Sequence, residues 1–249
     1  MFHWYGALLA IAVLVVYLLA EKRVRHLGIS ADSFSQLALP IVLAGFIGAR
    51  FWHVATDWSY YFANPIEAVF IWQGGLSIFG GILGGAFGLW QGMRHVQKIT
   101  VSFFELSDSI ILMLPIGQAI GRLGNWVNQE LYGMPTNLPW KIFIAPERRL
   151  SGFEQFSYYH PLFAYEAIAL LVFTAIIWRL EKTQTIFWKI GTGRITTAYI
   201  LFYSVLRFLL DFIRPDKQLL FSSIGVNQVL VLAITLGLGG IMYVRKIKA

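Results

Sequence analysis

The sequence contains no cysteine, and only 13% of its 249 residues are charged. The absence of cysteine excludes disulfides, cysteine-ligated metals and a thiol nucleophile supplied by the protein itself. A soluble domain typically carries about twice this charged fraction. Here 57% of the residues are apolar and the mean hydropathy is +0.63. The composition therefore predicts an integral membrane protein.

The sequence motifs of several enzyme classes are also missing. No zinc-ligand spacing, Walker-type loop, serine-centred elbow or Rossmann glycine fingerprint occurs, and residues 121–124 (GRLG) lack the required strand–helix context. We expect neither a metal nor a cofactor. The formal charge of +7 does not form a polybasic arm, so we expect no nucleic-acid partner. The basic residues instead form short clusters beside apolar spans, where they indicate topology.

Seven apolar runs predict an all-α, polytopic membrane domain covering residues 1–249. The predicted transmembrane helices are approximately residues 2–20, 37–54, 65–93, 101–120, 161–178, 194–213 and 224–244. Basic residues follow the first run instead of preceding it, so we expect that run to remain as a helix and not to be cleaved as a signal peptide. Residues 130–159 are too long for a plain loop and predict a small extramembrane lobe.

The distribution of lysine and arginine predicts the orientation. With the N-terminus outside, the predicted inner loops hold three, two, four and three of the twenty Lys and Arg residues. Because positive charge prefers the cytoplasmic side, we predict seven helices with the N-terminus outside and the C-terminus inside. This topology brings the polar groups of the fourth, fifth and sixth spans, and the lobe, to the outer side.

The most informative stretch is residues 121–133 (GRLGNWVNQELYG), which ends an apolar run. Polar groups at membrane depth cost free energy unless they pair or face water, so they indicate a functional site. On a helix, Arg122, Asn125 and Gln129 would share one face. An arginine beside amide groups is a good phosphate receptor, because its planar fork binds two oxygens. The alternative interpretation is a polar loop after a membrane helix.

A second polar cluster lies in the sixth span, where an arginine, an aspartate and another arginine follow i, i+4, i+7 spacing. One aspartate cannot neutralise two arginines, and two further arginines lie in or beside apolar spans. The arginines are Arg50, Arg122, Arg207 and Arg214, and the candidate carboxylates are Glu130, Glu166 and Asp211. The excess of arginine favours an anionic ligand. An ion-pair network within the protein is the alternative.

Two further stretches carry candidate residues. In the third span, Gln73, Gly74 and Gly75 favour non-helical backbone that lines a cavity, whereas the later glycines favour helix packing. His160 precedes Pro161, which suits the first turn of the fifth helix. A histidine there is more often an interfacial capping residue than a catalyst.

With these residues in place, the chain resembles the bacterial prolipoprotein diacylglyceryl transferases. Residues 121–133 match the family signature, Gly-Arg-x-Gly-Asn followed by Asn, Glu and Gly, and further matches lie in order at residues 3–6, 48–50, 73–78, 160–166 and 207–214. The resemblance implies transfer of an sn-1,2-diacylglyceryl group from phosphatidylglycerol to the lipobox cysteine of a preprolipoprotein. The products would be a thioether-linked lipid and glycerol 1-phosphate. A non-catalytic phospholipid-binding or transport protein on the same fold is the alternative.

The resemblance also implies a location and roles for individual residues. The protein would lie in the bacterial cytoplasmic (inner) membrane, with its site towards the outer leaflet and no cofactor. The expected catalytic residues are Arg122, Arg207, Tyr5, Glu130 and His160, with the two arginines binding phosphate and stabilising the departing charge. The residues expected to contact phosphatidylglycerol, besides Arg122, are Asn125, Asn128, Gly133, Gln73, Gly74, Gly75, Arg50, Glu166, Asp211 and Arg214.

One departure from the family pattern concerns the base that deprotonates the thiol. Many members of the family place a histidine where this chain has Phe79, which cannot accept a proton. We hypothesise that the positive field of the arginines lowers the pKa of the substrate thiol enough that no dedicated base is required. Tyr5, Glu130 and His160 are the side-chain alternatives.

Overall fold

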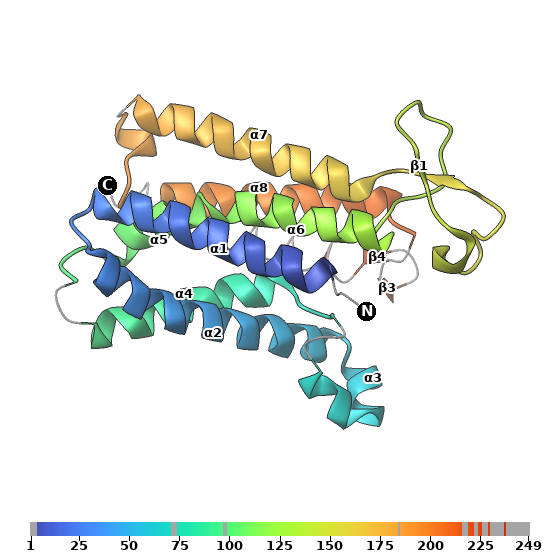
Figure 1. Cartoon of the computed structure of the whole chain (residues 1–249), viewed down its shortest axis with the longest axis horizontal. Helices are drawn as coiled ribbons and strands as arrows, with labels where there is room; N and C mark the ends of the chain where they lie inside the picture. Colours follow the sequence, from blue (N-terminus) through green and yellow to red (C-terminus); the bar gives the residue numbers. More distant parts are fainter. Residues whose placement is uncertain are drawn as a thin grey trace. The chain divides into compact units, whose positions relative to one another are not determined.

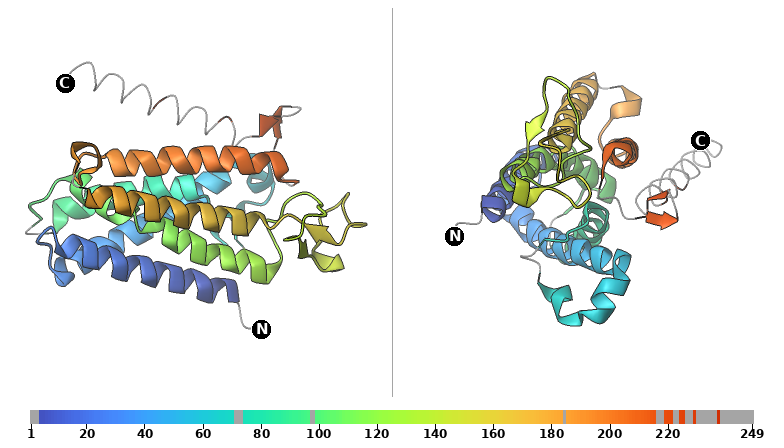
Figure 2. Two further views of the ribbon diagram at one scale, coloured as in Figure 1. Left: turned by 90° about the horizontal axis from the view of Figure 1, so that it is seen from above. Right: turned by 90° about the vertical axis from the view of Figure 1, so that its right-hand side faces the viewer.

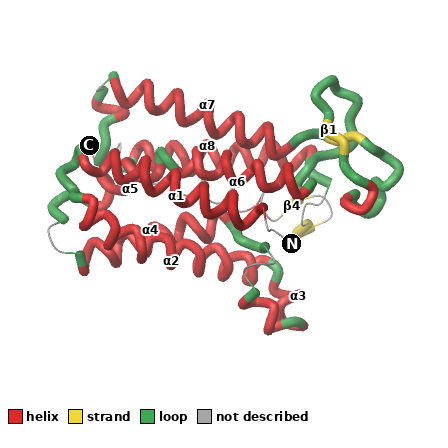
Figure 3. The backbone as a smooth tube through the Cα atoms, viewed as in Figure 1, coloured by secondary structure: helices red, strands yellow, loops and turns green. Residues whose placement is uncertain are grey.

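The computed structural model describes residues 4–70, 74–96, 99–183, 185–215, 219–221, 224–225, 229 and 237. These residues are mostly helical, as Figure 3 shows, in agreement with the predicted class. The chain divides into two compact units, which are described separately. One contains residues 17–110 and 190–193, and the other contains residues 1–16, 111–189 and 194–249. Helix α1 (Trp4–Arg25) contributes residues to both.

The unit formed by residues 17–110 and 190–193 is built on two long helices. Helices α2 (Ala31–Thr56) and α4 (Ile78–His95) pack side by side (Figure 1). Glycines make this close approach possible, because a Cβ added to Gly84 would lie 2.1 Å from the carbonyl oxygen of Ala44. The predicted packing role of the later glycines is therefore confirmed.

The chain between α2 and α4 is not a continuous helix. It forms a short helix α3 (Trp58–Ala63) and a 3-10 turn η1 (Pro65–Val69) before α4 begins. Gly74 and Gly75 have positive φ angles of 93° and 71°, which a right-handed helix does not accommodate. The non-helical backbone predicted at Gly74 and Gly75 is therefore confirmed, whereas the helix predicted over residues 65–93 begins only at residue 78.

The other unit contains three long helices that pack in sequence order. Helix α6 (Leu114–Asn128) packs on α7 (Leu162–Lys182), and α7 packs on α8 (Arg194–Leu210), as Figure 2 shows. The predicted span 101–120 is in fact two consecutive helices, α5 (Phe103–Ile111) and α6. Because α6 continues to residue 128, most of the signature stretch is helical and is not a loop.

The end of α8 also differs from the prediction. The helix is followed by a single 3-10 turn, η5 (Asp211–Ile213), after which Arg214 has extended backbone with φ −95° and ψ 121°. Arg207, Asp211 and Arg214 therefore do not share one face of a continuous helix. The i, i+4 relation between Arg207 and Asp211 persists, as described below.

Four stretches of the described residues are long and apolar enough to cross a membrane. They are Ala31–Thr56, Phe103–Asn128, Leu162–Lys182 and Arg194–Ile213. They overlap the predicted second, fourth, fifth and sixth spans. Large apolar side chains such as Ile47, Phe51 and Leu209 are exposed on them, as lipid-facing residues would be. The predicted span 224–244 lies almost entirely outside the described residues.

Residues 130–159 form a small folded lobe, as predicted from their length. Strand β1 (Ile142–Phe143) pairs antiparallel with β2 (Tyr158–Tyr159), and a 3-10 turn η3 (Pro146–Arg148) lies between them. The buried core of the lobe consists of Tyr132, Ile144 and Tyr159. A second short pair, β3 (Leu219–Phe221) and β4 (Ile224–Gly225), lies near the C-terminal end of the described chain.

Candidate active site

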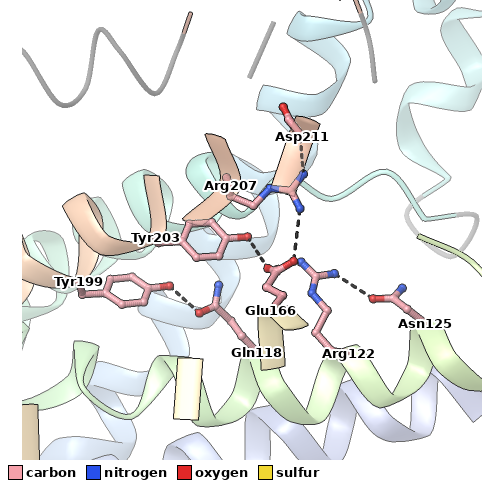
Figure 4. A network of polar contacts seen from close by, with 8 residues as sticks. All are labelled: Gln118, Arg122, Asn125, Glu166, Tyr199, Tyr203, Arg207 and Asp211. Carbon is pink, nitrogen blue, oxygen red and sulfur yellow. Dashed lines mark hydrogen bonds and ion pairs between the residues drawn. The ribbon is translucent and has the colours of Figure 1, made fainter. Parts of the chain in front are cut away.

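The carboxylate of Glu166 on α7 is the centre of a buried polar cluster (Figure 4). Its Oε1 accepts hydrogen bonds from Arg122 Nη2 at 2.6 Å and from the Tyr203 hydroxyl at 3.0 Å. Its Oε2 accepts a hydrogen bond from Arg207 Nη1 at 3.3 Å. Because Arg122 lies on α6 and the other two donors lie on α8, one carboxylate joins three helices.

Burial explains why this carboxylate needs several partners. Glu166 is only 3% exposed, and a buried charge is costly unless it is paired and hydrogen-bonded. Both of its oxygens are engaged by guanidinium groups, and a hydroxyl adds a third donor. Glu166, one of the candidate carboxylates named from the sequence, is thus paired with two arginines. Glu166 thus holds two positively charged guanidinium groups close to each other, against their electrostatic repulsion.

A second carboxylate completes the ion-pair cluster. Asp211 Oδ1 lies 3.5 Å from Arg207 Nη2, one helical turn further along the chain, and Asp211 is 1% exposed. The pair Arg207–Asp211 is the one that the i, i+4 spacing predicted. Arg207 is therefore held on two sides, by Glu166 and by Asp211 (Figure 4).

The signature residues extend the cluster towards the lobe. Arg122 Nη1 donates to Asn125 Oδ1 at 2.9 Å, and Asn125 Nδ2 donates to Glu130 Oε1 at 2.9 Å. Asn128 Nδ2 donates to the same Glu130 oxygen at 3.3 Å. The exposed Glu130 thus reaches Arg122 through the amide of Asn125. These contacts orient the Arg122 guanidinium at a second point.

The predicted shared face of the signature helix does not extend to Gln129. This residue ends α6 in the left-handed conformation, with φ 53° and ψ 47°. Its Oε1 accepts a hydrogen bond from the backbone N–H of Ala145 at 2.7 Å, inside the lobe. The side chain thus ties the end of the helix to the lobe, and the prediction that it shares a face with Arg122 and Asn125 is wrong.

A small cavity of about 10 Å³ adjoins the cluster. Its walls are formed by Arg122, Leu131, Leu162, Phe163, Glu166, Arg207 and Arg214. This space is about what one water molecule requires. The Nε atom of Arg122 is buried and has no hydrogen-bond partner among the described residues. Three arginines and one carboxylate in these walls favour an anionic oxygen in this space.

Gly133 brings the lobe against the start of α7. Its N–H donates to the carbonyl of His160 at 2.8 Å. A Cβ at this position would lie 2.4 Å from Leu162 Cδ1 and 2.9 Å from the carbonyl oxygen of Ile213. These contacts support a packing role for Gly133, since only a glycine fits there without displacing its neighbours.

His160 lies at the junction of the lobe and α7, and burial lowers the pKa of its imidazole. The ring is therefore neutral at neutral pH. Its Nδ1 lies 3.0 Å from the hydroxyl of Tyr165, and that hydroxyl accepts a hydrogen bond from Trp140 Nε1 at 2.7 Å. The Nδ1 of His160 is thus engaged with Tyr165, which is in turn bonded to Trp140 of the lobe. These contacts support a structural role for His160 at the junction of the lobe and α7.

We expect His160→Ala to lower kcat by less than about tenfold, because a general base normally contributes 10²–10⁴-fold. The pH dependence of kcat should keep its position along the pH axis. Steady-state rates of product formation from pH 5.5 to 9 would measure both quantities. A loss above about 100-fold with an unchanged melting temperature would instead assign the thiol base to His160.

Several of the predicted site residues lie outside the described part of the unit that contains this cluster. Arg50, Gly74 and Gly75 lie in the other compact unit. Phe79, at the position where many members of the family carry a histidine, is buried in α4 of that same unit. The side chain of Tyr5 and the whole of Gln73 lie outside the described residues.

Three residues of the network were missed by the sequence analysis. Tyr203 lies one helical turn before Arg207, and Gln118 lies one turn before Arg122. The hydroxyl of Tyr199 donates to Gln118 Oε1 at 2.7 Å, extending the polar contacts along α6 and α8 (Figure 4). Tyr203 and Gln118 each lie four residues before an arginine, and this spacing predicts that they share a helix face with it.

Apolar helices that enclose an arginine–carboxylate cluster define a membrane protein with a buried site suited to an anionic group. The sequence profile of the family described as Prolipoprotein diacylglyceryl transferase matches residues 1–244 of this chain. The chain therefore belongs to the prolipoprotein diacylglyceryl transferase family, which confirms the resemblance seen in its motifs.

Individual relatives agree with this family over nearly the full length. The chain is 35% identical to the phosphatidylglycerol–prolipoprotein diacylglyceryl transferase of Synechococcus elongatus, over 99% of this chain and 84% of the relative. The enzyme of the same name from Trichormus variabilis is 36% identical, over 98% of this chain and 86% of its own. That of Thermotoga maritima is 35% identical, over 98% and 81% respectively.

Proposed function

We propose that this protein transfers the sn-1,2-diacylglyceryl group of phosphatidylglycerol to the thiol of a lipobox cysteine in a preprolipoprotein. A carbon–sulfur bond forms at the glyceryl carbon that carries the phosphate, the carbon–oxygen bond to that phosphate breaks, and glycerol 1-phosphate leaves. The thiol proton passes to solvent. Family membership supports this proposal, as does the absence of cysteine, because the nucleophile belongs to the substrate.

The observation that carries the proposal is the pair of guanidinium groups, from Arg122 and Arg207, on the single buried carboxylate of Glu166. Charge that develops on a departing phosphate ester is stabilised by donors that are already oriented. In the proposed site, Arg122 and Arg207 bind the phosphate, with Arg214 beside them. Asn125 and Asn128 contact the glyceryl headgroup, and Glu130 keeps their amides oriented.

Binding requires the site to change from the described arrangement. A cavity of about 10 Å³ accommodates a water molecule and not a phosphate group. Leu131, in the cavity wall, has a positive φ of 52°, a conformation that costs a non-glycine residue free energy. We propose that the lipid headgroup displaces this wall while Glu166 keeps the two arginines in place.

The thiol is activated in this proposal by the field of the arginines. A nearby positive charge favours the thiolate, and the thiolate is the reactive form. Phe79 is not able to act as a base, and Nδ1 of His160 is engaged with the hydroxyl of Tyr165. Field activation therefore remains our hypothesis for the first step.

We further propose the topology that this reaction needs. Seven transmembrane helices, an outer N-terminus and an inner C-terminus would bring the signature residues and the lobe to the outer side of the bacterial cytoplasmic membrane. A preprolipoprotein would present its signal peptide and lipobox there after export. The positions of lysine and arginine support this orientation.

The proposal is tested with purified protein in detergent, phosphatidylglycerol and a lipobox peptide. Glycerol phosphate release and the mass of the peptide are followed together. We expect both products with the parent peptide and neither with a Cys→Ser peptide. Lipid binding without either product would support the non-catalytic alternative, and Phe79→His would then show whether a histidine restores turnover.

A further inference from the structure

Four backbone carbonyls surround the guanidinium of Arg50 on α2. Its Nε donates to Ala68 at 2.8 Å and its Nη2 donates to Glu67 at 2.5 Å. Its Nη1 donates to Gly74 at 2.8 Å and to Gly75 at 3.1 Å. The residue is 7% exposed. One side chain thus connects the end of η1 and the segment that precedes α4 to the C-terminal part of α2.

Carbonyl dipoles take the place of a carboxylate partner for this cation. Arg50 forms no ion pair within the described part of the chain, and its guanidinium carbon lies 5.2 Å from the centre of the Tyr61 ring. A buried charge must be compensated by hydrogen bonds, and an aromatic face adds to that compensation. Four of the five guanidinium N–H groups are already used in this way. Little capacity remains to bind a phosphate.

The backbone conformation of Gly74 and Gly75 suits this contact with Arg50. Gly74 and Gly75 have φ angles of 93° and 71°, in the left-handed region that favours glycine. A Cβ on Gly75 would lie 2.6 Å from Arg50 Nη1 and 2.5 Å from the ring of His53. Gly75 is therefore needed for the backbone to reach the guanidinium.

The contact of these carbonyls with Arg50 also determines the orientation of two backbone N–H groups. In a trans peptide the N–H and C=O are on opposite sides, so carbonyls turned to Arg50 direct the N–H groups of Gly75 and Leu76 the other way. Neither N–H has a backbone acceptor among the described residues. Loss of the Arg50 contacts would free both peptide planes to rotate.

We propose that Arg50 is a positioning residue that fixes the Gly74–Gly75 backbone for the transfer reaction and does not itself bind phosphatidylglycerol. This changes the role expected from the resemblance, in which Arg50 contacts the lipid. The kinetic part of this proposal, the effect of Arg50 on the transfer reaction, rests on the proposed transferase activity. The structural part, that Arg50 orders this segment, stands independently of it.

The test compares Arg50→Lys and Arg50→Ala in the full-length protein. Lysine keeps the charge but has no planar fork and does not reach four carbonyls. We expect both variants to lose about 100-fold in kcat, as the loss of a positioning contact does, with KM for phosphatidylglycerol within about threefold of the parent. Hydrogen exchange of the Ser77 amide, which donates to the carbonyl of Ala49 at 3.0 Å, should accelerate about tenfold, and that of residues 114–128 should not change.

The matched control is Arg94→Ala, which removes an exposed arginine stacked on Trp90 in the same unit. The Arg94→Ala variant should change neither kcat nor the rates of amide hydrogen exchange. If Arg50→Ala does not fold, Gly75→Ala leaves Arg50 in place but pushes a methyl group into it, and should reproduce the loss of kcat.

Two results would overturn the inference. One is Arg50→Lys with most of the activity and a raised KM, as expected for a charge that contacts the lipid. The other is unchanged exchange of the Ser77 amide in Arg50→Lys and in the folded Ala variant. A parent protein that forms no product would instead refute the transferase proposal, while the exchange measurement would still decide whether Arg50 orders the segment.

Discussion

Arg122→Lys is expected to lower kcat/KM by at least about 100-fold, although the charge is kept. The Arg122 guanidinium donates at once to Glu166 and to Asn125, from two different nitrogens. A lysine ammonium is a compact point charge that does not reproduce this fork. Loss of one oriented donor to a developing oxyanion typically costs 10²–10³-fold in kcat. Single-turnover transfer to a lipobox peptide would measure the loss.

The pH profile of Arg122→Gln tests field activation separately from geometry. The positive charge of Arg122 lowers the pKa of the substrate thiol, so its removal raises that pKa. The alkaline-rising limb of kcat/KM should therefore move to higher pH in Arg122→Gln and stay in place in Arg122→Lys. Arg148→Gln is the matched control, since Arg148 is exposed on the lobe of the same unit. Activity that survives Arg122→Lys but collapses in His160→Ala would refute field activation.

Short-range spacing was enough to predict the local pairs of the site. Arg122 with Asn125 and Arg207 with Asp211 are three and four residues apart, and helical geometry alone brings such residues together. Pairing of Glu166 with arginine followed from the cost of a carboxylate among apolar residues. The two local pairs needed no knowledge of the tertiary arrangement, and the cost of burial indicated only that Glu166 has a cationic partner, not which one.

Predictions failed where the backbone leaves regular geometry. Gln129 adopts a left-handed conformation that directs its side chain to the lobe, and Arg214 follows a 3-10 turn. The sequence carries no strong signal for either, because both are compatible with a continuing helix. The contacts of Arg50 were not predicted, for a related reason. Its acceptors are backbone carbonyls, which side-chain patterns do not reveal.

Tertiary structure was also needed to see that one carboxylate serves both arginines. Glu166 is 44 residues from Arg122 and 41 from Arg207 along the chain. The sequence analysis counted carboxylates against arginines and treated Glu166 as a ligand of the lipid. The structure shows both of its oxygens occupied by protein donors. We therefore propose that Glu166 acts on the substrate indirectly, by orienting the two arginines.

Glu166→Gln is expected to destabilise the protein by about 3–5 kcal/mol, because it leaves two buried guanidinium groups without their shared counter-ion. We expect kcat to fall by about 100-fold or more, since neither arginine is then held in place. KM for phosphatidylglycerol should stay the same or fall, because the site becomes more positive towards an anionic headgroup. The free energy of unfolding in mixed micelles and steady-state kinetics would measure these quantities.

Two comparisons separate this role from a general loss of stability. Tyr203→Phe removes only the hydroxyl that donates to Oε1, so it should cost about 1.5–3 kcal/mol and leave most of kcat. Glu147→Gln, on the exposed surface of the lobe, should change neither quantity. A rise in KM for Glu166→Gln with kcat unchanged would mean that Glu166 contacts the lipid directly. A stable variant with normal kcat would mean that the arginines keep their geometry without Glu166, and the positioning role would then be wrong.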